Sequence, residues 1–214
     1  MKRPAPGAVR AKPAAAPGSM RTKLAAAPGE VRIIGGQWKR TRLPVAKLEG
    51  LRPTPDRVRE TLFNWLGQDL GGWRVVDAFA GTGALGLEAA SRGATDVLLI
   101  ELDAGLLANL RALKQRLGAA AVRVQGGDGV AALAALAPAS VDLVLLDPPF
   151  EQAALPAPAL AAAARAVRPG GFIYLETPQR WDDAALDALG LAAHRHLKAG
   201  AVHAHLLARP APSA

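Results

Sequence analysis

The spacing of hydrophobic residues changes regularly along the chain. From residue 73 onward, short apolar runs that end near Gly, Asp or Pro alternate with longer segments in which apolar residues recur every three or four positions. The first pattern is typical of buried strands and the second of helices packed on one side. We therefore predict strands at 73–79, 95–101, 121–125, 141–147, 172–176, 191–197 and 201–208, and helices near 83–92, 103–117, 129–136, 153–167 and 182–189.

A further helix is predicted within residues 50–70, ahead of the first of these strands. Val58 and Leu62 belong to its apolar stripe. Thr54 is the expected N-cap, and Pro55 occupies the first turn, where its missing N–H does no harm. The arginines of the segment fall on its polar side: Arg52, Arg57 and Arg59.

The order of the predicted elements determines much of the topology. Strands separated by helices form βαβ units, and such units build a mostly parallel sheet. The last two strands differ, because only Lys198, Ala199 and Gly200 join them. Three residues are too few for a crossover, so these strands must pair antiparallel. The sequence thus predicts an α/β fold whose parallel sheet ends in an antiparallel hairpin.

The first fifty residues carry the excess positive charge of the chain. They contain eleven Lys or Arg against two Glu, while the formal charge of the whole chain is +8. Residues 1–29 are rich in Ala and Pro, which predicts a disordered basic tail; a solubilising tail or an organelle transit peptide would also fit. In residues 30–50, apolar and basic positions alternate around a Gly-Gly pair, which predicts a basic β-hairpin that contacts nucleic acid.

The composition excludes several kinds of chemistry. There is no cysteine, so no disulfide, thiolate metal site or thiol nucleophile can form. No apolar run approaches the roughly 18 residues that span a bilayer, and we expect a cytoplasmic protein without a membrane partner. Four histidines flank a predicted turn near the C-terminus. Because neither carboxylates at metal spacing nor cysteines accompany them, we interpret them as surface residues of the hairpin and predict no metal site.

Residues 73–86 read WRVVDAFAGTGALG, a strand, a glycine turn and the start of a helix. Backbone N–H groups at such a helix N-terminus face a ligand, and Gly81 and Gly83 permit its close approach. Two ligand classes stay open from this turn alone. Gly81 to Gly86 match the G-x-G-x-x-G of dinucleotide binding, with Glu101 twenty residues past the first glycine. The same turn also matches the D-x-F-x-G-x-G of an S-adenosylmethionine (AdoMet) site.

A second motif, Asp147-Pro148-Pro149-Phe150, follows the predicted strand at 141–147. It resembles the (Asp/Asn)-Pro-Pro-aromatic motif of AdoMet-dependent methyltransferases that modify exocyclic amines of nucleobases. Such an amine is a poor nucleophile, because its lone pair is conjugated into the ring. If the Asp147 carboxylate and the Pro148 carbonyl accept its two hydrogens, the nitrogen pyramidalises and its lone pair can attack a methyl group.

The remaining residues of this motif suit the same task. Prolines stiffen the turn that holds the carbonyl, and Phe150 can stack on the base. A Pro-rich loop after a core strand is the alternative interpretation of the motif alone. The two motifs on successive strand ends together favour AdoMet over a dinucleotide. They also favour the class I AdoMet-dependent methyltransferase architecture, which is Rossmann-like with a C-terminal antiparallel hairpin.

Acidic residues at the strand ends are candidates for holding the cofactor. In an open α/β sheet the ligand lies beyond the carboxyl ends of the strands. There Asp77 can hold the methionine ammonium, Glu101 the ribose hydroxyls, and Asp128 the adenine amine. Each acid alone could equally cap a helix or lie in a loop, but the ordered set favours a site. The cofactor-binding candidates are Asp77, Phe79, Ala80, Gly81, Thr82, Gly83, Glu101, Gly127 and Asp128.

Five segments resemble the RsmD-type 16S ribosomal RNA guanine-N2 methyltransferases of bacteria: residues 32–44, 51–66, 77–93, 100–103 and 146–150. The resemblance implies a methyltransferase domain over 51–209, with a short tail at 210–214. It implies AdoMet as cofactor, residues 147–150 as the catalytic loop, and guanine N2 of 16S rRNA as the target. The RNA-contacting candidates are Arg32, Lys39, Arg40, Arg42, Arg52 and Arg57.

The expected partner is 16S rRNA within a small-subunit assembly particle, and we expect the protein to act as a monomer. Two alternatives remain. The Pro-Pro-aromatic loop also serves DNA or RNA adenine-N6 methyltransferases. A nucleic-acid-binding protein without catalytic activity could retain the same fold, although intact glycines, Asp147 and Phe150 argue against it.

Overall fold

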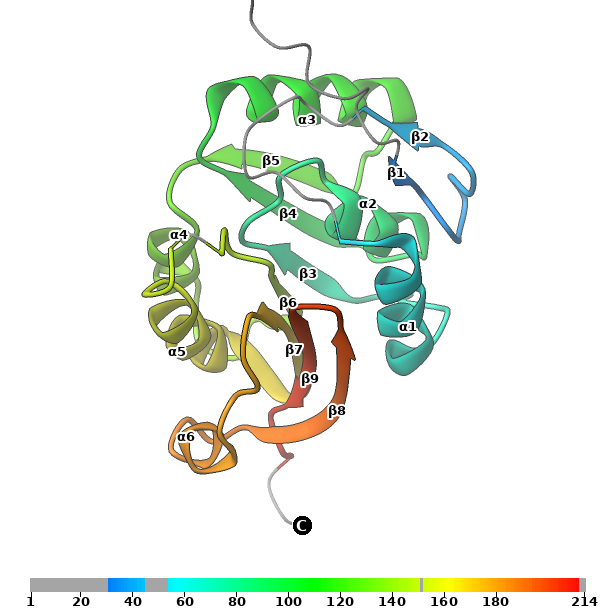
Figure 1. Ribbon diagram of the computed structural model, residues 1–214. Coiled ribbons are helices and arrows are strands. Elements are labelled where there is room, and N and C mark those ends of the chain that lie inside the picture. Colours follow the sequence, from blue (N-terminus) through cyan, green and yellow to red (C-terminus); the bar gives the residue numbers. More distant parts are fainter. Residues whose placement is uncertain (1–30, 45–53, 151, 212–214) are drawn as a thin grey trace, which may run out of the picture.

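A seven-stranded sheet forms the centre of the computed structural model, which describes residues 31–44, 54–150 and 152–211 (Figure 1). The strands lie in the order β5-β4-β3-β6-β7-β9-β8. Strands β3 to β7 pair parallel, whereas β9 pairs antiparallel with both β7 and β8. This confirms the predicted class I methyltransferase architecture. The strands are β3 Arg74–Asp77, β4 Asp96–Glu101, β5 Val122–Gly126, β6 Val141–Leu146, β7 Val167–Thr177, β8 Ala192–Ala199 and β9 Val202–Ala208.

Helices cover both faces of this sheet (Figure 1). One face packs against α1 Asp56–Leu66, α2 Ala84–Ser91 and α3 Ala104–Leu117, and the other against α4 Gly129–Ala135, α5 Pro156–Ala166 and α6 Asp183–Asp187. Successive side chains of a strand point to opposite faces. Val75 and Leu145 therefore join the first core, and Val76 and Leu146 join the second. The parallel strands are apolar on both faces because both faces are buried.

The bounds of two elements differ from the predicted ones around residues 153–172. Helix α5 begins at Pro156, because proline fits a first helical turn but clashes further inside a helix. Strand β7 begins at Val167, five residues before its predicted start, where it pairs with Val141. The alanine-rich segment is helical as predicted, and the residues that β7 gains are 167–171, of which only Val167 was predicted as helix.

Thr54 does not cap α1, contrary to the prediction. The N-cap is Pro55, and no side chain makes a capping hydrogen bond there. The buried Thr54 hydroxyl instead donates to Oδ2 of Asp147 at 3.0 Å. A contact with a distant carboxylate has replaced local capping, and it ties the start of α1 to the end of β6.

The N-terminal hairpin is present but pairs over only two residues a strand, β1 Val31–Arg32 and β2 Arg42–Leu43. Its turn docks on the C-terminal end of α2. Gly36 has φ 73°, and a Cβ at this position would lie 1.8 Å from the carbonyl oxygen of Ser91. Only glycine permits this approach, which explains the Gly-Gly pair in the sequence.

Glu88 of α2 anchors the hairpin from inside the protein. Its oxygens accept from the backbone N–H groups of Ile34 and Gly35 at 2.7 and 2.8 Å, and from Arg92 at 2.8 Å. Arg59 lies on its other side, with nitrogen and oxygen 3.7 Å apart and neither side chain exposed. The prediction that Arg59 faces solvent is therefore wrong. The buried carboxylate offsets the cost of removing this guanidinium from water.

Several predictions fall outside the described residues: the tail at 1–29, Arg52, the hairpin residues 45–50 and the last positions of the C-terminal tail, 212–214. Among the residues that the structure describes, no helix is long and apolar enough to cross a membrane.

Candidate AdoMet and base site

The glycine turn follows β3 directly and leads into α2. Gly83 is the N-cap of α2 with φ 80°, and Gly81 has φ 53°. A Cβ on Gly83 would lie 2.7 Å from Cδ2 of Leu110, so the bare backbone is required here. Among the other predicted residues of the turn, Ala80 and Thr82 are buried and Phe79 is half-buried. The first N–H groups of α2 thus lie at the carboxyl edge of the sheet, where an anionic or polar ligand group binds well.

Asp77, the last residue of β3, is buried, and no described Lys, Arg or His forms an ion pair with it. Its Oδ2 accepts from the Gly86 N–H at 3.0 Å, while its Oδ1 has no hydrogen-bond partner. Burial raises the pKa of Asp77 to about 7, against the backbone N–H groups of Gly86 and Phe79, which lower it. A buried carboxylate oxygen without a partner among the described residues can accept from a cationic group such as the methionine ammonium of AdoMet.

Glu101 ends β4 beside the glycine turn. Its Oε2 accepts from the Gly81 N–H and its Oε1 from the Asp103 N–H, each at 2.8 Å. A carboxylate oxygen has a second lone pair, so both oxygens can still accept a ribose hydroxyl. The next residue, Leu102, is 74% exposed. Leu102 was not predicted as a site residue, because a leucine after a strand gives no signal until its exposure is known.

Asp128 serves first as the N-cap of α4, because its Oδ1 accepts from the Ala131 N–H at 2.7 Å. Asp128 is therefore one of the acids that cap a helix, as the alternative interpretation allowed. Its side chain is nevertheless exposed beside the site. Gly127 has φ 147°, and a Cβ there would meet no atom within 4 Å. Its N–H donates to the carbonyl of Glu101 at 3.0 Å. The two loops are thus tied together with open space beside the glycine.

Asp147 lies just beyond β6, the strand next to β3. On the next strand, the Tyr174 hydroxyl donates to Oε1 of Glu176 at 2.6 Å. Residues 146 and 175 are paired across β6 and β7. Asp147 and Glu176 each come directly after one of these two residues, so their carboxyl groups lie at corresponding positions of neighbouring strands. Burial raises the pKa of Asp147 well above its usual range, and the charge of Glu176 raises it further, against the hydroxyl of Thr54. Burial likewise raises the pKa of Glu176.

This group of Thr54, Asp147, Tyr174 and Glu176 was only partly predicted. Asp147 was expected from its motif, whereas the other three join it through tertiary contacts. Within the motif, Pro148 is buried while Pro149 is exposed. Phe150 is 41% exposed, and with Leu102 it is one of two large hydrophobic side chains that stand exposed in the described part of the chain. Both follow the carboxyl ends of sheet strands, where a flat ligand could cover them.

The predicted RNA-contacting residues within the described part of the chain lie on the hairpin and on α1. The hairpin presents Arg32, Lys39, Arg40 and Arg42 as exposed side chains, and Arg57 is exposed on α1. The hairpin adjoins α3, since Arg116 donates to the carbonyl of Arg42 at 2.9 Å (Figure 1). Trp38 packs against the core and is only half-buried.

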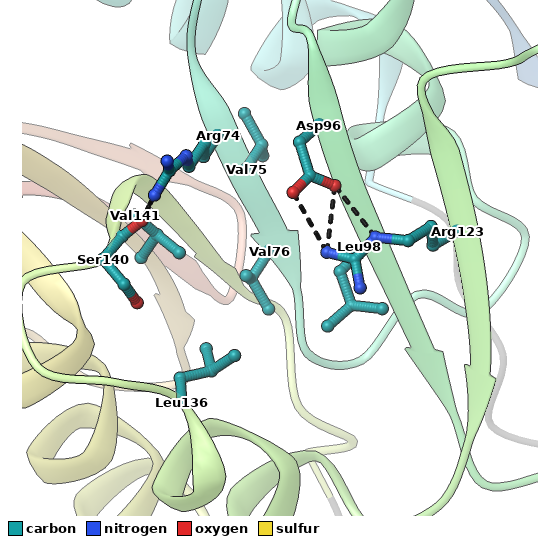
Figure 2. A pocket seen from close by; sticks show the side chains of 9 residues that line it. All are labelled: Arg74, Val75, Val76, Asp96, Leu98, Arg123, Leu136, Ser140 and Val141. Carbon is teal, nitrogen blue, oxygen red and sulfur yellow. Dashed lines mark hydrogen bonds and ion pairs between the residues drawn. The ribbon is translucent and has the colours of Figure 1, made fainter.

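A small hollow lies at the opposite end of the sheet, where the strands begin (Figure 2). Its volume is about 220 Å³, and residues from the starts of β3, β4 and β6 line it. The bidentate ion pair of Arg123 with Asp96, at 3.0 and 3.1 Å, lies along one wall. Because these charges already satisfy each other and the strand carboxyl ends are remote, we do not assign the chemistry to this hollow.

A family model described as Conserved hypothetical protein 95 matches residues 31–208, which include the hairpin, the glycine turn and the Asp-Pro-Pro-Phe loop. The chain belongs to this family. Members of the family with a curated name confirm the resemblance to RsmD. A Haemophilus influenzae protein named Ribosomal RNA small subunit methyltransferase D is 40% identical over 178 residues, which cover 77% of this chain and 92% of that protein.

Further relatives agree with this membership. The Escherichia coli (strain K12) protein of the same name is 47% identical over 129 residues, or 58% of this chain, and the match spans 63% of that relative's length. Among solved structures, a putative methyltransferase yhhF from Escherichia coli has a TM-score of 0.72 at 35% identity, covering 86% of this chain and 99% of its own. A SAM dependent methyltransferase from Aquifex aeolicus, at 16% identity and a TM-score of 0.55, covers 72% of this chain and 93% of its own and shares the fold alone.

Proposed function

We propose that this family member transfers a methyl group from AdoMet to the exocyclic N2 of a guanine in small-subunit rRNA. The observation that carries the proposal is the adjacency of two strand ends: β3 ends in the unpaired Asp77 and the glycine turn, and β6 ends in the Asp147 loop. A cofactor at the first and a base at the second would lie side by side at the carboxyl edge of the sheet.

The residues at the end of β3 and β4 fit AdoMet. Oδ1 of Asp77 would accept from the methionine ammonium, and Glu101 would accept from the ribose hydroxyls. The exposed Leu102 side chain offers an apolar surface to the adenine ring, with open space beside Gly127. When bound, AdoMet supplies a methyl group made electrophilic by its positively charged sulfur.

The residues at the end of β6 and β7 fit guanine better than adenine. The Watson–Crick edge of guanine presents two adjacent donors, the ring N1–H and the N2 amine, whereas adenine presents an acceptor next to its amine. Asp147 and Glu176 are two neighbouring acceptors, of which the Thr54 and Tyr174 hydroxyls orient one each. In our proposal Asp147 and the Pro148 carbonyl hold the amine, Glu176 accepts from N1–H, and Phe150 stacks on the ring.

The raised pKa values of Asp147 and Glu176 agree with this assignment. Glu176 is buried and Asp147 is half-buried, and neither has a cationic partner among the described residues, so the two carboxyl groups resist ionisation together. Guanine would bring the donors that stabilise both charged forms. The amine would then be held by acceptors before the methyl group arrives, which lowers the barrier mainly through positioning.

The basic hairpin provides the RNA surface in this proposal. Lys39 and Arg40 are exposed on a hairpin that Glu88 anchors to α2, the helix that starts at the glycine turn. Guanine N2 is shielded inside a paired helix, so the target nucleotide should be unstacked or extruded. We propose a monomer that acts in the cytoplasm on an assembling small-subunit particle.

The test is transfer of labelled methyl from AdoMet to 16S RNA, small-subunit particles or duplex DNA, followed by digestion to nucleosides. We expect label in N2-methylguanine, with particles as the best substrate. The Asp147→Ala variant is the matched control, because it should bind AdoMet without transfer. Label in N6-methyladenine, or a preference for DNA, would overturn the guanine assignment. AdoMet binding without transfer to any substrate would support the non-catalytic alternative.

A further inference from the structure

Three of the four C-terminal histidines form a cluster on one face of the β8–β9 hairpin. His196 of β8 is paired with His205 of β9, and His203 lies two residues before His205, so all three project to the same side. The candidate ligand nitrogens of the three imidazoles all lie within 4.8 Å of one another. Nε2 of His196 and Nδ1 of His203 are only 2.9 Å apart.

The prediction that these histidines are surface residues is wrong for His205. This imidazole is 3% exposed and lies between two backbone groups. Its Nδ1–H donates to the carbonyl of Leu175 at 3.2 Å, and its Nε2 accepts from the Trp181 N–H at 3.1 Å. This pair of bonds requires a neutral ring with its proton on Nδ1, and burial lowers the pKa of His205 to about 4.

The arrangement has the features of a histidine metal site. A ligand imidazole usually donates its second N–H to a carbonyl, as His205 does to Leu175. Three imidazole nitrogens bound to one zinc ion at about 2.0–2.1 Å in tetrahedral geometry lie about 3.3 Å apart. The observed spacing, from 2.9 Å to at most 4.8 Å, brackets that value. His196 is exposed and His203 half-buried, so modest side-chain rotations can close the remaining distance.

We propose that His196, His203 and His205 bind one divalent cation of the zinc class and thereby link β8 to β9. Imidazole nitrogen suits Zn²⁺, Ni²⁺ and Cu²⁺, and is a poor ligand for Mg²⁺ or Ca²⁺. Three neutral histidines leave a fourth position for water. The proton shared between His196 and His203 moves to the outer nitrogen of the donating ring, so binding requires no net loss of a proton from the pair.

Two features limit the affinity. The Trp181 N–H must give up its bond to Nε2 of His205 when a cation takes the single lone pair of that nitrogen. The positive charge of Arg180 also acts on His196 and His205 and opposes a cation. We therefore expect a dissociation constant of about 0.1–10 µM, which is weaker than the structural zinc sites that drive folding.

The test uses the full-length chain without a polyhistidine tag, dialysed to equilibrium against Zn²⁺. We expect one ion per chain, and a dissociation constant at least about tenfold higher in both His196→Ala and His203→Ala, since each removes one of three ligands. His194→Ala is the matched control. It removes a histidine of the same strand whose ring packs on Phe172, at 5.5 Å between centroids, instead of joining the cluster. It should bind zinc as the unaltered chain does.

A spectroscopic measurement separates this site from loose binding at surface imidazoles. Co²⁺ in place of Zn²⁺ should give the strong visible absorption of a tetrahedral centre, and the Trp181 amide resonance should shift because its acceptor is taken. Both signals should be absent in the His203→Ala variant. Zinc binding that is equally tight in His196→Ala and His203→Ala, or no binding at about 100 µM free zinc, would overturn the proposal.

Discussion

Replacing Asp77 by Asn should stabilise the cofactor-free protein at alkaline pH. Asp77 has one oxygen on the Gly86 N–H and one without a partner, and its pKa rises from 3.8 to about 7. A rise of about three pKa units corresponds to about 4 kcal/mol at about 1.36 kcal/mol a unit. The amide of Asn keeps the acceptor for Gly86 and carries no charge, so it removes this cost.

The direction with pH follows from the raised pKa. The folded protein binds the Asp77 proton more tightly than the unfolded chain does, so protonation of Asp77 stabilises the fold. This stabilisation is complete below the unfolded pKa of about 4. It is lost as the pH rises through about 7. Urea unfolding without cofactor should therefore give Asp77→Asn and the unaltered chain similar stability near pH 4. At pH 8 the variant should be more stable by up to about 4 kcal/mol.

The same substitution should weaken AdoMet binding by about ten- to a hundredfold, because a hydrogen bond to a charged group contributes about 1.5–3 kcal/mol. Calorimetric titration measures this, and Asp96→Asn is a suitable control, since Asp96 pairs with Arg123 on the surface at the other end of the sheet. The reasoning fails if Asp77→Asn is no more stable than the unaltered chain at pH 8. It also fails if AdoMet affinity is unchanged.

Three further variants test the base and RNA sites. Asp147→Ala should lower methyl transfer at least about a hundredfold with little change in AdoMet affinity by calorimetry; a parallel collapse of affinity and rate would assign Asp147 to the cofactor. Glu176→Gln replaces one acceptor by a donor and should lower kcat/KM on rRNA at least about tenfold without loss of thermal stability; unchanged turnover would remove Glu176 from the base site. Replacing Lys39, Arg40 and Arg42 together by alanine should make the slope of log K against log[salt] for RNA binding shallower by up to about three units, since each phosphate contact contributes roughly −0.7 to −0.9. An unchanged slope in filter-binding measurements would place the RNA elsewhere.

The sheet could be predicted because its signals are local. Each strand is a short apolar run ended by a turn residue, and the short connection between β8 and β9, Gly200 and Ala201, allows only an antiparallel pairing. The glycine turn and the Asp-Pro-Pro-Phe loop are also contiguous in sequence, so their positions at strand ends followed from the strand prediction. Asp77, Glu101 and Asp147 accordingly lie at the carboxyl edge of the sheet.

What the sequence could not provide are contacts between distant segments. Thr54 reads as a helix cap, and only the folded chain brings its hydroxyl to Asp147, 93 positions away. Arg59 reads as a solvated arginine, because nothing nearby in sequence announces the buried Glu88. The histidine cluster has the same origin, since a bulge between residues 193 and 195 sets which histidines of β8 face those of β9. A one-residue change of register moves a side chain to the other face.

The acidic residues inside the protein have two opposite kinds of surroundings, and the difference lies in whether their charge is compensated within the folded chain. Glu88 is buried with two arginines beside it and two backbone N–H groups bonded to it, so its charge is compensated within the folded chain. Asp77 has only backbone N–H donors and no cationic partner among the described residues. Asp147 and Glu176 face each other's charge with only hydroxyl donors. A carboxyl group left uncompensated costs stability. Three such groups lie at one edge of this sheet, and it is there that we propose a cationic cofactor and the donors of a base would bind.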